Sequence, residues 1–159
     1  MALDLLQKST DPEIRKHEAG LWNNLGSALD KFDDRLAEAT QAWKNALKIN
    51  PDLVPSLDSL ANKISDDGDI KTANELLERA ENAARRQGDI SRASAAKFKR
   101  LTLLPRVYES TKEIFEVRAK FMGNLEELPN VLHGMPVQGM DRRHLTESLQ
   151  AGIIYEEFM

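Results

Sequence analysis

The sequence predicts an all-α protein, a short α-solenoid of helix–turn–helix repeats with capping and connector helices at its C-terminal end. Two observations lead to this prediction. Apolar residues recur at helical spacing along most of the chain. In addition, the pattern of apolar and small residues that begins at Trp22 returns after Pro51, as Leu57, Leu60, Ala61, Ala73 and Leu77.

The first copy of the pattern, from Trp22 to Pro51, is similar to the tetratricopeptide (TPR) repeat, whose halves read W-x2-L-G-x2-Y and A-x3-F…P. Leu29 stands in place of the usual Tyr, and one extra residue before Ala39 fits a turn at residues 32–35. We expect Gly26 to let the second helix approach closely and small residues to keep the crossing tight. The residues that we expect to line this crossing are Ala39 and Ala46, with Trp22, Leu25 and Trp43 filling the space between the helices.

The second copy fits a 34-residue repeat without a gap when Leu57 is placed on the Trp22 position. Ala61 then takes the position of the close-approach glycine, and Gly68-Asp69 supplies the turn between two helices. Helices are therefore expected at residues 11–32, 35–48, 53–65 and 70–87.

Beyond Gln87 the repeat register weakens. Gly88-Asp89 repeats the turn signal, so we interpret residues 89–103 as a helix that caps the stack, because terminal repeats are atypical. This region is basic, which indicates either a solvated cap face or a patch for an anionic partner. The basic residues are Arg85, Arg86, Arg92, Lys97, Lys99 and Arg100.

We divide the chain into a repeat domain, residues 1–104, and a connector with C-terminal helices, residues 105–159. Thr10 with Glu13, and Ser110 with Glu113, have the spacing of capping boxes. The second box predicts a helix at 111–128 that ends before Pro129, followed by a loop at 130–140. A last amphipathic helix then begins at Asp141. Its apolar pattern is still running at Met159, so either it ends against a partner or, as we expect, more protein follows.

Composition narrows the function classes. Apolar residues make up 41% and charged residues 30%, the net charge is -4, and there is no cysteine. This excludes thiol chemistry and disulfides and gives no electrostatic footprint for nucleic acid. No apolar run approaches the length of a membrane span, and the N-terminus does not resemble a secretory signal. We therefore expect a cytoplasmic protein that is not associated with a membrane.

No residue pattern predicts catalysis, a metal site or a cofactor. His17, His133 and His144 are far apart in sequence, and adjacent carboxylates such as Glu156-Glu157 point apart on a helix. Gly134 and Gly139 lack the spacing of a phosphate-binding loop. We therefore expect this chain not to be an enzyme.

The connector shows a more specific resemblance, carried by Pro105, Val107, Tyr108, Ser110, Glu113 and Ile114, and then by Arg118, Phe121, Leu125 and Leu128. It is similar to the segment that links TPR repeats to the glycosyltransferase region of bacterial SPINDLY-like, O-linked N-acetylglucosamine transferase-like proteins. The likeness covers residues 22–158, but the catalytic region is absent. It implies a substrate-presenting arm that belongs to, or acts with, a glycosyltransferase.

The first helix of each TPR repeat lines a concave groove, where polar side chains can bond a passing peptide backbone. The resemblance implies that Asn24 takes the position of the family's peptide-binding Asn, although Ser59 replaces it in the second repeat. The predicted peptide-binding residues are Asn23, Asn24, Ser27, Lys31, Asp58, Asn62 and Ser65; ordinary solvated polar residues remain the alternative.

The leading functional hypothesis is therefore a protein–protein interaction module that binds an extended peptide or protein segment. The alternative is an assembly scaffold, in which the last helix mediates homo-oligomerisation or docking into a larger complex. Its predicted assembly face consists of Ile153, Ile154 and Phe158. A small enzyme is a third possibility, disfavoured because no reactive constellation is found.

Overall fold

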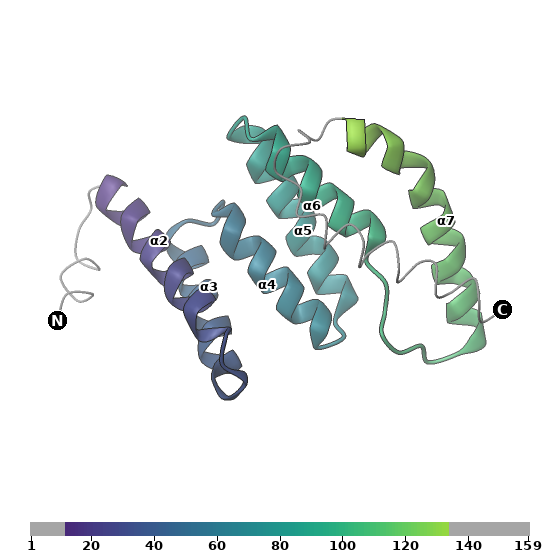
Figure 1. The fold of residues 1–159 in the computed structure, drawn as a ribbon, viewed down its shortest axis with the longest axis horizontal. Coiled ribbons are helices and arrows are strands. Elements are labelled where there is room, and N and C mark those ends of the chain that lie inside the picture. The colour runs from purple at the N-terminus through teal and green to yellow at the C-terminus, as the bar shows by residue number, and fades with distance from the viewer. Residues whose placement is uncertain (1–11, 134–159) are drawn as a thin grey trace.

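The computed structural model describes residues 12–133, and within this range the chain is all-helical, with no strand. Six α-helices and one 3-10 turn follow one another (Figure 1). They are α2 (Pro12–Leu29), η1 (Asp33–Arg35), α3 (Leu36–Ile49), α4 (Val54–Asp66), α5 (Ile70–Arg86), α6 (Ile90–Thr102) and α7 (Thr111–His133). The expected helices up to residue 103 are thus present, with ends shifted by at most three residues.

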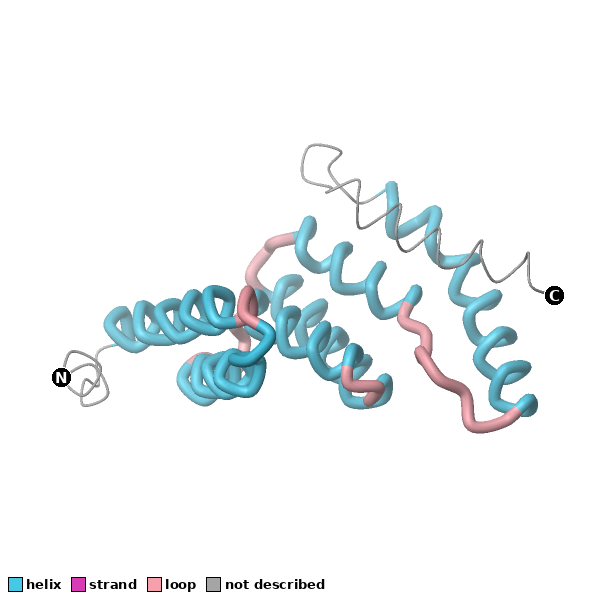
Figure 2. Tube along the Cα trace, turned by 60° about the horizontal axis from the view of Figure 1, so that its bottom comes forward, coloured by secondary structure: helices cyan, strands magenta, loops and turns pink. Residues whose placement is uncertain are grey.

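Neighbouring helices pack against each other in chain order. The most extensive contacts are α2 on α3, α4 on α5 and α5 on α6, the contacts of α6 with α7 and of α3 with α4 are clearly smaller, and α2 touches α4 only lightly. The helices consequently form an elongated row with α2 at one end and α7 at the other (Figures 1 and 2).

The crossing of α2 and α3 is as tight as the sequence predicts. A Cβ atom placed on Gly26 would lie 2.5 Å from Nε1 of Trp43, and Ala39 and Ala46 are completely buried. Leu29, in the usual Tyr position, packs with Trp43 and Ala39. The prediction for Leu25 is wrong: this side chain is 42% exposed, because Leu29 and Gly26 occupy the positions that face Trp43.

The turns on either side of α5 share one design. Gly68 and Gly88 adopt φ of 94° and 74°, in the left-handed region that favours glycine. The aspartate that follows each glycine caps the next helix: Asp69 accepts a hydrogen bond from the Thr72 N–H at 3.0 Å, and Asp89 accepts one from the Arg92 N–H at 2.9 Å. Both turns predicted from Gly-Asp are confirmed.

Buried apolar side chains within residues 12–133 form three separate clusters. The first joins α2 to α3 through Leu29, Ala39 and Trp43. The central cluster joins α4, α5 and α6, and the third joins α6 to α7. The central cluster consists of Val54, Leu57, Leu60, Ala61, Leu76, Leu77, Ala80, Ala83, Ala84, Ala93 and Ala96.

The predicted end of α7 at Pro129 is wrong, as is the start of a loop at residue 130. The helix continues through Pro129 to His133, although an interior proline lacks the N–H of the helical ladder. Burial explains the continuation: Leu128 and Val131, on either side of the proline, pack against Phe98 and Leu101 of α6.

The start of α7 partly confirms the second capping box. Ser110 Oγ accepts a hydrogen bond from the Glu113 N–H at 3.2 Å, whereas the Glu113 carboxylate accepts from the N–H of Glu109 rather than that of Ser110. Thr10, the rest of the predicted loop up to residue 140 and the predicted last helix lie outside the described residues.

Candidate functional site

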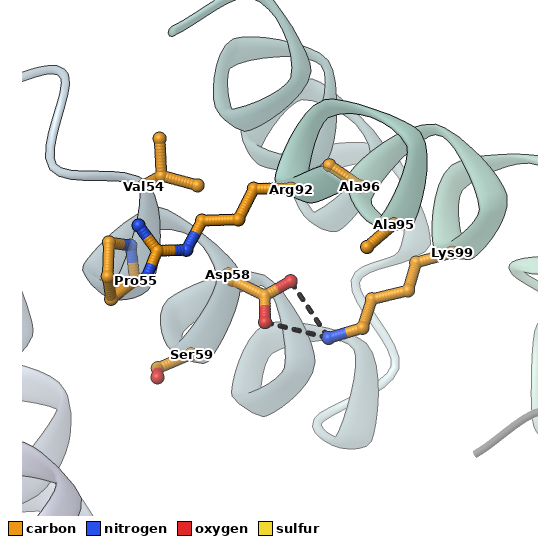
Figure 3. Close-up of a pocket in the computed structure, with 8 residues that line it drawn as sticks. All are labelled: Val54, Pro55, Asp58, Ser59, Arg92, Ala95, Ala96 and Lys99. Atoms are coloured by element: carbon orange, nitrogen blue, oxygen red, sulfur yellow. Dashed lines mark hydrogen bonds and ion pairs between the residues drawn. The ribbon is translucent and has the colours of Figure 1, made fainter. Parts of the chain in front are cut away.

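A cleft of about 280 Å³ lies between α4 and α6, which are not consecutive in the chain (Figure 3). Each helix contributes residues at spacings of three and four, which places them on one face. From α4 these are Val54, Pro55, Asp58 and Ser59; from α6 they are Arg92, Ala95, Ala96 and Lys99. The cleft stays open because Ala95 and Ala96 of α6 are small, and the charged side chains of Asp58, Arg92 and Lys99 border it.

An ion pair joins the two walls of the cleft. Lys99 Nζ donates to both carboxylate oxygens of Asp58, at 2.8 and 2.7 Å (Figure 3). The two side chains are about one-third exposed, at 32% and 34%, so the pair is only partly screened by solvent. It connects the predicted groove helix α4 to α6.

Arg92 differs from Lys99 because its ion pair stays within its own turn. Its Nη1 lies 3.3 Å from Oδ2 of Asp89, three residues earlier, and its side chain is 59% exposed. In Figure 3 the guanidinium extends across the cleft toward the Pro55 end of α4. The lining therefore carries two cations and one carboxylate, and the carboxylate is already paired with Lys99.

Of the predicted peptide-binding residues, only Asp58 lines this cleft. Asn23 is half-buried, and its Oδ1 accepts a hydrogen bond of 2.9 Å from the buried Ser56 Oγ, which ties α2 to α4. Ser27 donates to the backbone oxygen of Asn23 at 3.1 Å. The remaining ones lie outside the cleft: Asn24, Lys31 and Asn62 are exposed, and Ser65 is half-buried.

The basic residues between positions 85 and 100 mainly hold the helices together, a role that neither interpretation of the sequence gave them. Each of these six residues forms an ion pair, and four of these pairs connect different helices or a helix to a turn. The partners are Glu81 for Arg85 and Arg100, Asp52 for Arg86, Asp89 for Arg92, Glu127 for Lys97 and Asp58 for Lys99. Their charge is therefore largely compensated within the chain.

Sequence reasoning missed the α6 wall of the cleft. Arg92 and Lys99 are seven residues apart, with Ala95 and Ala96 between them, so the spacing already placed all four on one helix face. Interpreting residues 89–103 as a cap concealed this signal, because a cap is not expected to line a groove.

The histidines and the assembly face add little to the site. His17 is exposed, and its Nδ1 lies 2.8 Å from the Glu13 backbone oxygen. Across residues 12–133 no group of three or more His, Cys, Asp or Glu side chains has a metal-binding arrangement. His144, and the predicted assembly residues Ile153, Ile154 and Phe158, lie outside the part of the chain that the structure describes.

Comparisons with protein-family models, with curated protein sequences and with solved structures find no match for this chain. Among the described helices, none combines the length and the apolar character needed to cross a membrane.

Proposed function

We propose that this chain is a TPR-like binding module that holds an extended segment of another protein in the cleft between α4 and α6. The observation that carries the proposal is the cleft itself, where two helices from different parts of the chain present apolar, hydrogen-bonding and charged side chains together. Clefts that combine an apolar lining with a few convergent polar groups are typical binding sites.

The lining suits a particular kind of segment. Val54, Pro55 and Ala96 offer an apolar floor for a side chain, and Ser59 can donate or accept a hydrogen bond. Arg92 can exchange its exposed pair with Asp89 for a ligand carboxylate at little cost, since exposed ion pairs contribute about 0–1 kcal/mol. An extended segment that carries an acidic side chain next to an apolar one fits this chemistry.

Three features support the TPR-like interpretation of the fold. The Gly26–Trp43 crossing, the buried alanines of α3 and the capped Gly-Asp turns are the elements on which the sequence pattern rests. Together with the connector resemblance at residues 105–128, they support a role as the substrate-recognition arm of a glycosyltransferase-like protein. In that role the bound segment belongs to the acceptor protein.

The test begins with selection of phage-displayed random dodecapeptides on the full chain, followed by fluorescence anisotropy with labelled selected peptides. Filling the cleft with Ala95→Trp is expected to abolish binding, because Ala95 is exposed and lines the cleft. Ala119→Trp, on an exposed position of α7 away from the cleft, is the matched control and leaves affinity unchanged. Equal binding by both variants would overturn the proposal.

A second pair of variants tests the charge preference. Arg92→Gln is expected to lower the affinity for an acidic peptide by about tenfold, because one charge-assisted hydrogen bond is lost. Arg118→Gln on α7 is its control, since Arg118 is exposed and outside the cleft lining. If Arg92→Gln binds the acidic peptide as tightly as the control, the ligand does not use this cation.

The assembly hypothesis remains a prediction, because Ile153, Ile154 and Phe158 lie beyond the described residues. It is distinguished from peptide binding by Ile153→Asp with Ile154→Asp. This double variant abolishes concentration-dependent association if the last helix is the assembly face, and leaves peptide affinity unchanged.

A further inference from the structure

Lys99, one of the two cations that line the cleft between α4 and α6, is held by a carboxylate of the chain itself. Its Nζ donates to both oxygens of Asp58 across the cleft, at 2.8 and 2.7 Å (Figure 3). An ammonium group has three donors, so at most one remains for a ligand. A ligand carboxylate that used this donor would lie directly beside the Asp58 carboxylate, where like charges repel.

Arg92, the other cation of the lining, remains open to a ligand. Its ion pair with Asp89 is longer, at 3.3 Å, and lies within one turn of α6. A guanidinium group has five N–H donors in a planar fork, so it can bind a ligand carboxylate without leaving Asp89. Of the two cations, Arg92 is therefore the one that an acidic side chain can reach without displacing a partner.

The two cations have a spacing that an extended ligand can match. Arg92 and Lys99 are seven residues apart on α6, which is about 10 Å along the helix axis. In a polyproline II segment, residues three positions apart lie on the same face, about 9 Å from each other. Two acidic side chains at positions i and i+3 of such a segment would reach both cations if Asp58 released Lys99.

Asp58 and the second acidic side chain of such a ligand compete for the same ammonium group. Asp58 belongs to the chain, so it competes as a group at high local concentration. A ligand that displaces it exchanges charge-assisted hydrogen bonds for equivalent ones and leaves the freed Asp58 carboxylate in the cleft. Because the pair is only about one-third exposed, solvent screens this carboxylate incompletely, and the second acidic side chain gains nothing.

We propose that Asp58 is an internal competitor, which occupies Lys99 and restricts the cleft to segments with one acidic side chain. This inference rests on the proposed function of the cleft as a peptide-binding site, and it gives Asp58 a role opposite to that of a ligand-binding residue. The partner is then an extended segment whose single acidic side chain binds Arg92. Asp58 thus determines specificity by withholding a cation.

The experiment compares two fluorescein-labelled peptide probes by fluorescence anisotropy on the full chain. Both have a glutamate next to a valine; GPPEVPEPP has a second glutamate three positions further on, and GPPEVPQPP has a glutamine there. The unmodified chain is expected to bind both probes with the same Kd. Asp58→Asn is expected to bind GPPEVPEPP about tenfold more tightly than GPPEVPQPP, because one further charge-assisted hydrogen bond forms.

Two controls show whether Lys99 is the group that is released. Asp52→Asn removes the same charge from an ion pair outside the cleft lining, with Arg86 at 2.9 Å, and should leave the two Kd values equal. Adding Lys99→Gln to Asp58→Asn should abolish the preference for the second glutamate. Circular dichroism checks that the helices of every variant are intact.

Several results would overturn the proposal. Equal Kd values in Asp58→Asn, or a preference that persists after Lys99→Gln, would mean that Asp58 does not withhold Lys99 from the ligand. A preference for the second glutamate in the unmodified chain would mean that Asp58 does not compete. Loss of the helical signal in Asp58→Asn would mean that this carboxylate serves folding instead.

Failure of the underlying function gives a different result. If the cleft is not the binding site, the probes bind Ala95→Trp as tightly as Ala119→Trp, or bind neither the unmodified chain nor Asp58→Asn, and the inference falls with the function. If the inference alone fails, Ala95→Trp still abolishes binding of both probes, while Asp58→Asn shows no preference between them.

Discussion

Replacing Gly26 by alanine adds one methyl group at the tightest contact between two described helices. An ideal Cβ atom at this position would lie 2.5 Å from Nε1, 2.6 Å from Cδ1 and 2.9 Å from Cε2 of Trp43. Real Cβ atoms essentially never show contacts this short, and Trp43 is only 2% exposed. Gly26→Ala must therefore push α2 and α3 apart or displace the indole.

Two opposite effects set the magnitude. Alanine is favoured over glycine inside a helix by about 1 kcal/mol, and overpacking a tight core costs about 1–3 kcal/mol. Gly20→Ala is the matched control in the same helix, because a Cβ there meets nothing within 4 Å. We expect Gly20→Ala to stabilise the protein and Gly26→Ala to fall about 1–3 kcal/mol below it, the overpacking cost alone.

The assay is urea unfolding followed by tryptophan fluorescence in a Trp22→Phe background, so that Trp43 alone reports. Thermal unfolding gives a second reading, in which 1 kcal/mol corresponds to about 2–4 °C in Tm for a chain of this size. The emission of Trp43 should also shift to longer wavelength if the indole is displaced. A Gly26→Ala variant as stable as Gly20→Ala, with unchanged emission, would refute the close crossing.

Three further predictions concern α5 and α7. The pKa of Asp69 is lowered by hydrogen bonds from the side chain and the backbone of Thr72. The contribution of the ionised Asp69 to stability is therefore complete above the pKa of an unfolded aspartate and is lost as the pH falls through the lower pKa of the folded state. The free energy of unfolding, measured from neutral to acid pH, should exceed that of Asp69→Asn by an amount that shrinks as the pH falls. A difference that stays constant with pH contradicts this prediction. Glu81 is 8% exposed and pairs with two arginines, so Glu81→Gln should lower the free energy of unfolding by about 2–3 kcal/mol. The control Glu78→Gln, at an exposed position, should change it by no more than about 0.5 kcal/mol. Equal urea midpoints for the two variants would count against the buried network. Pro129→Ala should raise Tm by restoring a helical N–H, a gain of about 1–3 kcal/mol, and a lower Tm would show that the proline itself is part of the packing.

The fold was predicted best from the sequence where the local backbone geometry requires or favours one type of residue. A helix crossing too close for a Cβ requires glycine at position 26, and left-handed turns favour Gly68 and Gly88. Helix starts after Asp69 and Asp89 follow from side-chain capping. These needs are local, so spacing along the chain is enough to recognise them.

Predictions failed where contacts between distant segments outweigh local preference. Pro129 disfavours a helix on its own, but burial of the residues around it against α6 keeps α7 continuous. Leu25 matches the repeat pattern and yet faces outward. The α6 wall of the cleft was also missed because of a long-range contact. Lys99 pairs with Asp58, 41 residues away, and the residue spacing within one helix does not indicate which other helix it contacts.

The separation of the buried side chains into three clusters has a mechanical consequence. The first and the central cluster are linked by the half-buried Leu47 of α3, which packs against the central cluster, and by the hydrogen bond that Ser56 Oγ donates to Asn23 Oδ1. The central and the third cluster share helix α6. We therefore expect bending of the row to be concentrated between α3 and α4, where fewer buried apolar side chains are shared than within a cluster. Both walls of the cleft contribute to the central cluster, through Val54 and Ala96, so we expect the cleft to keep its width while the α2–α3 pair moves.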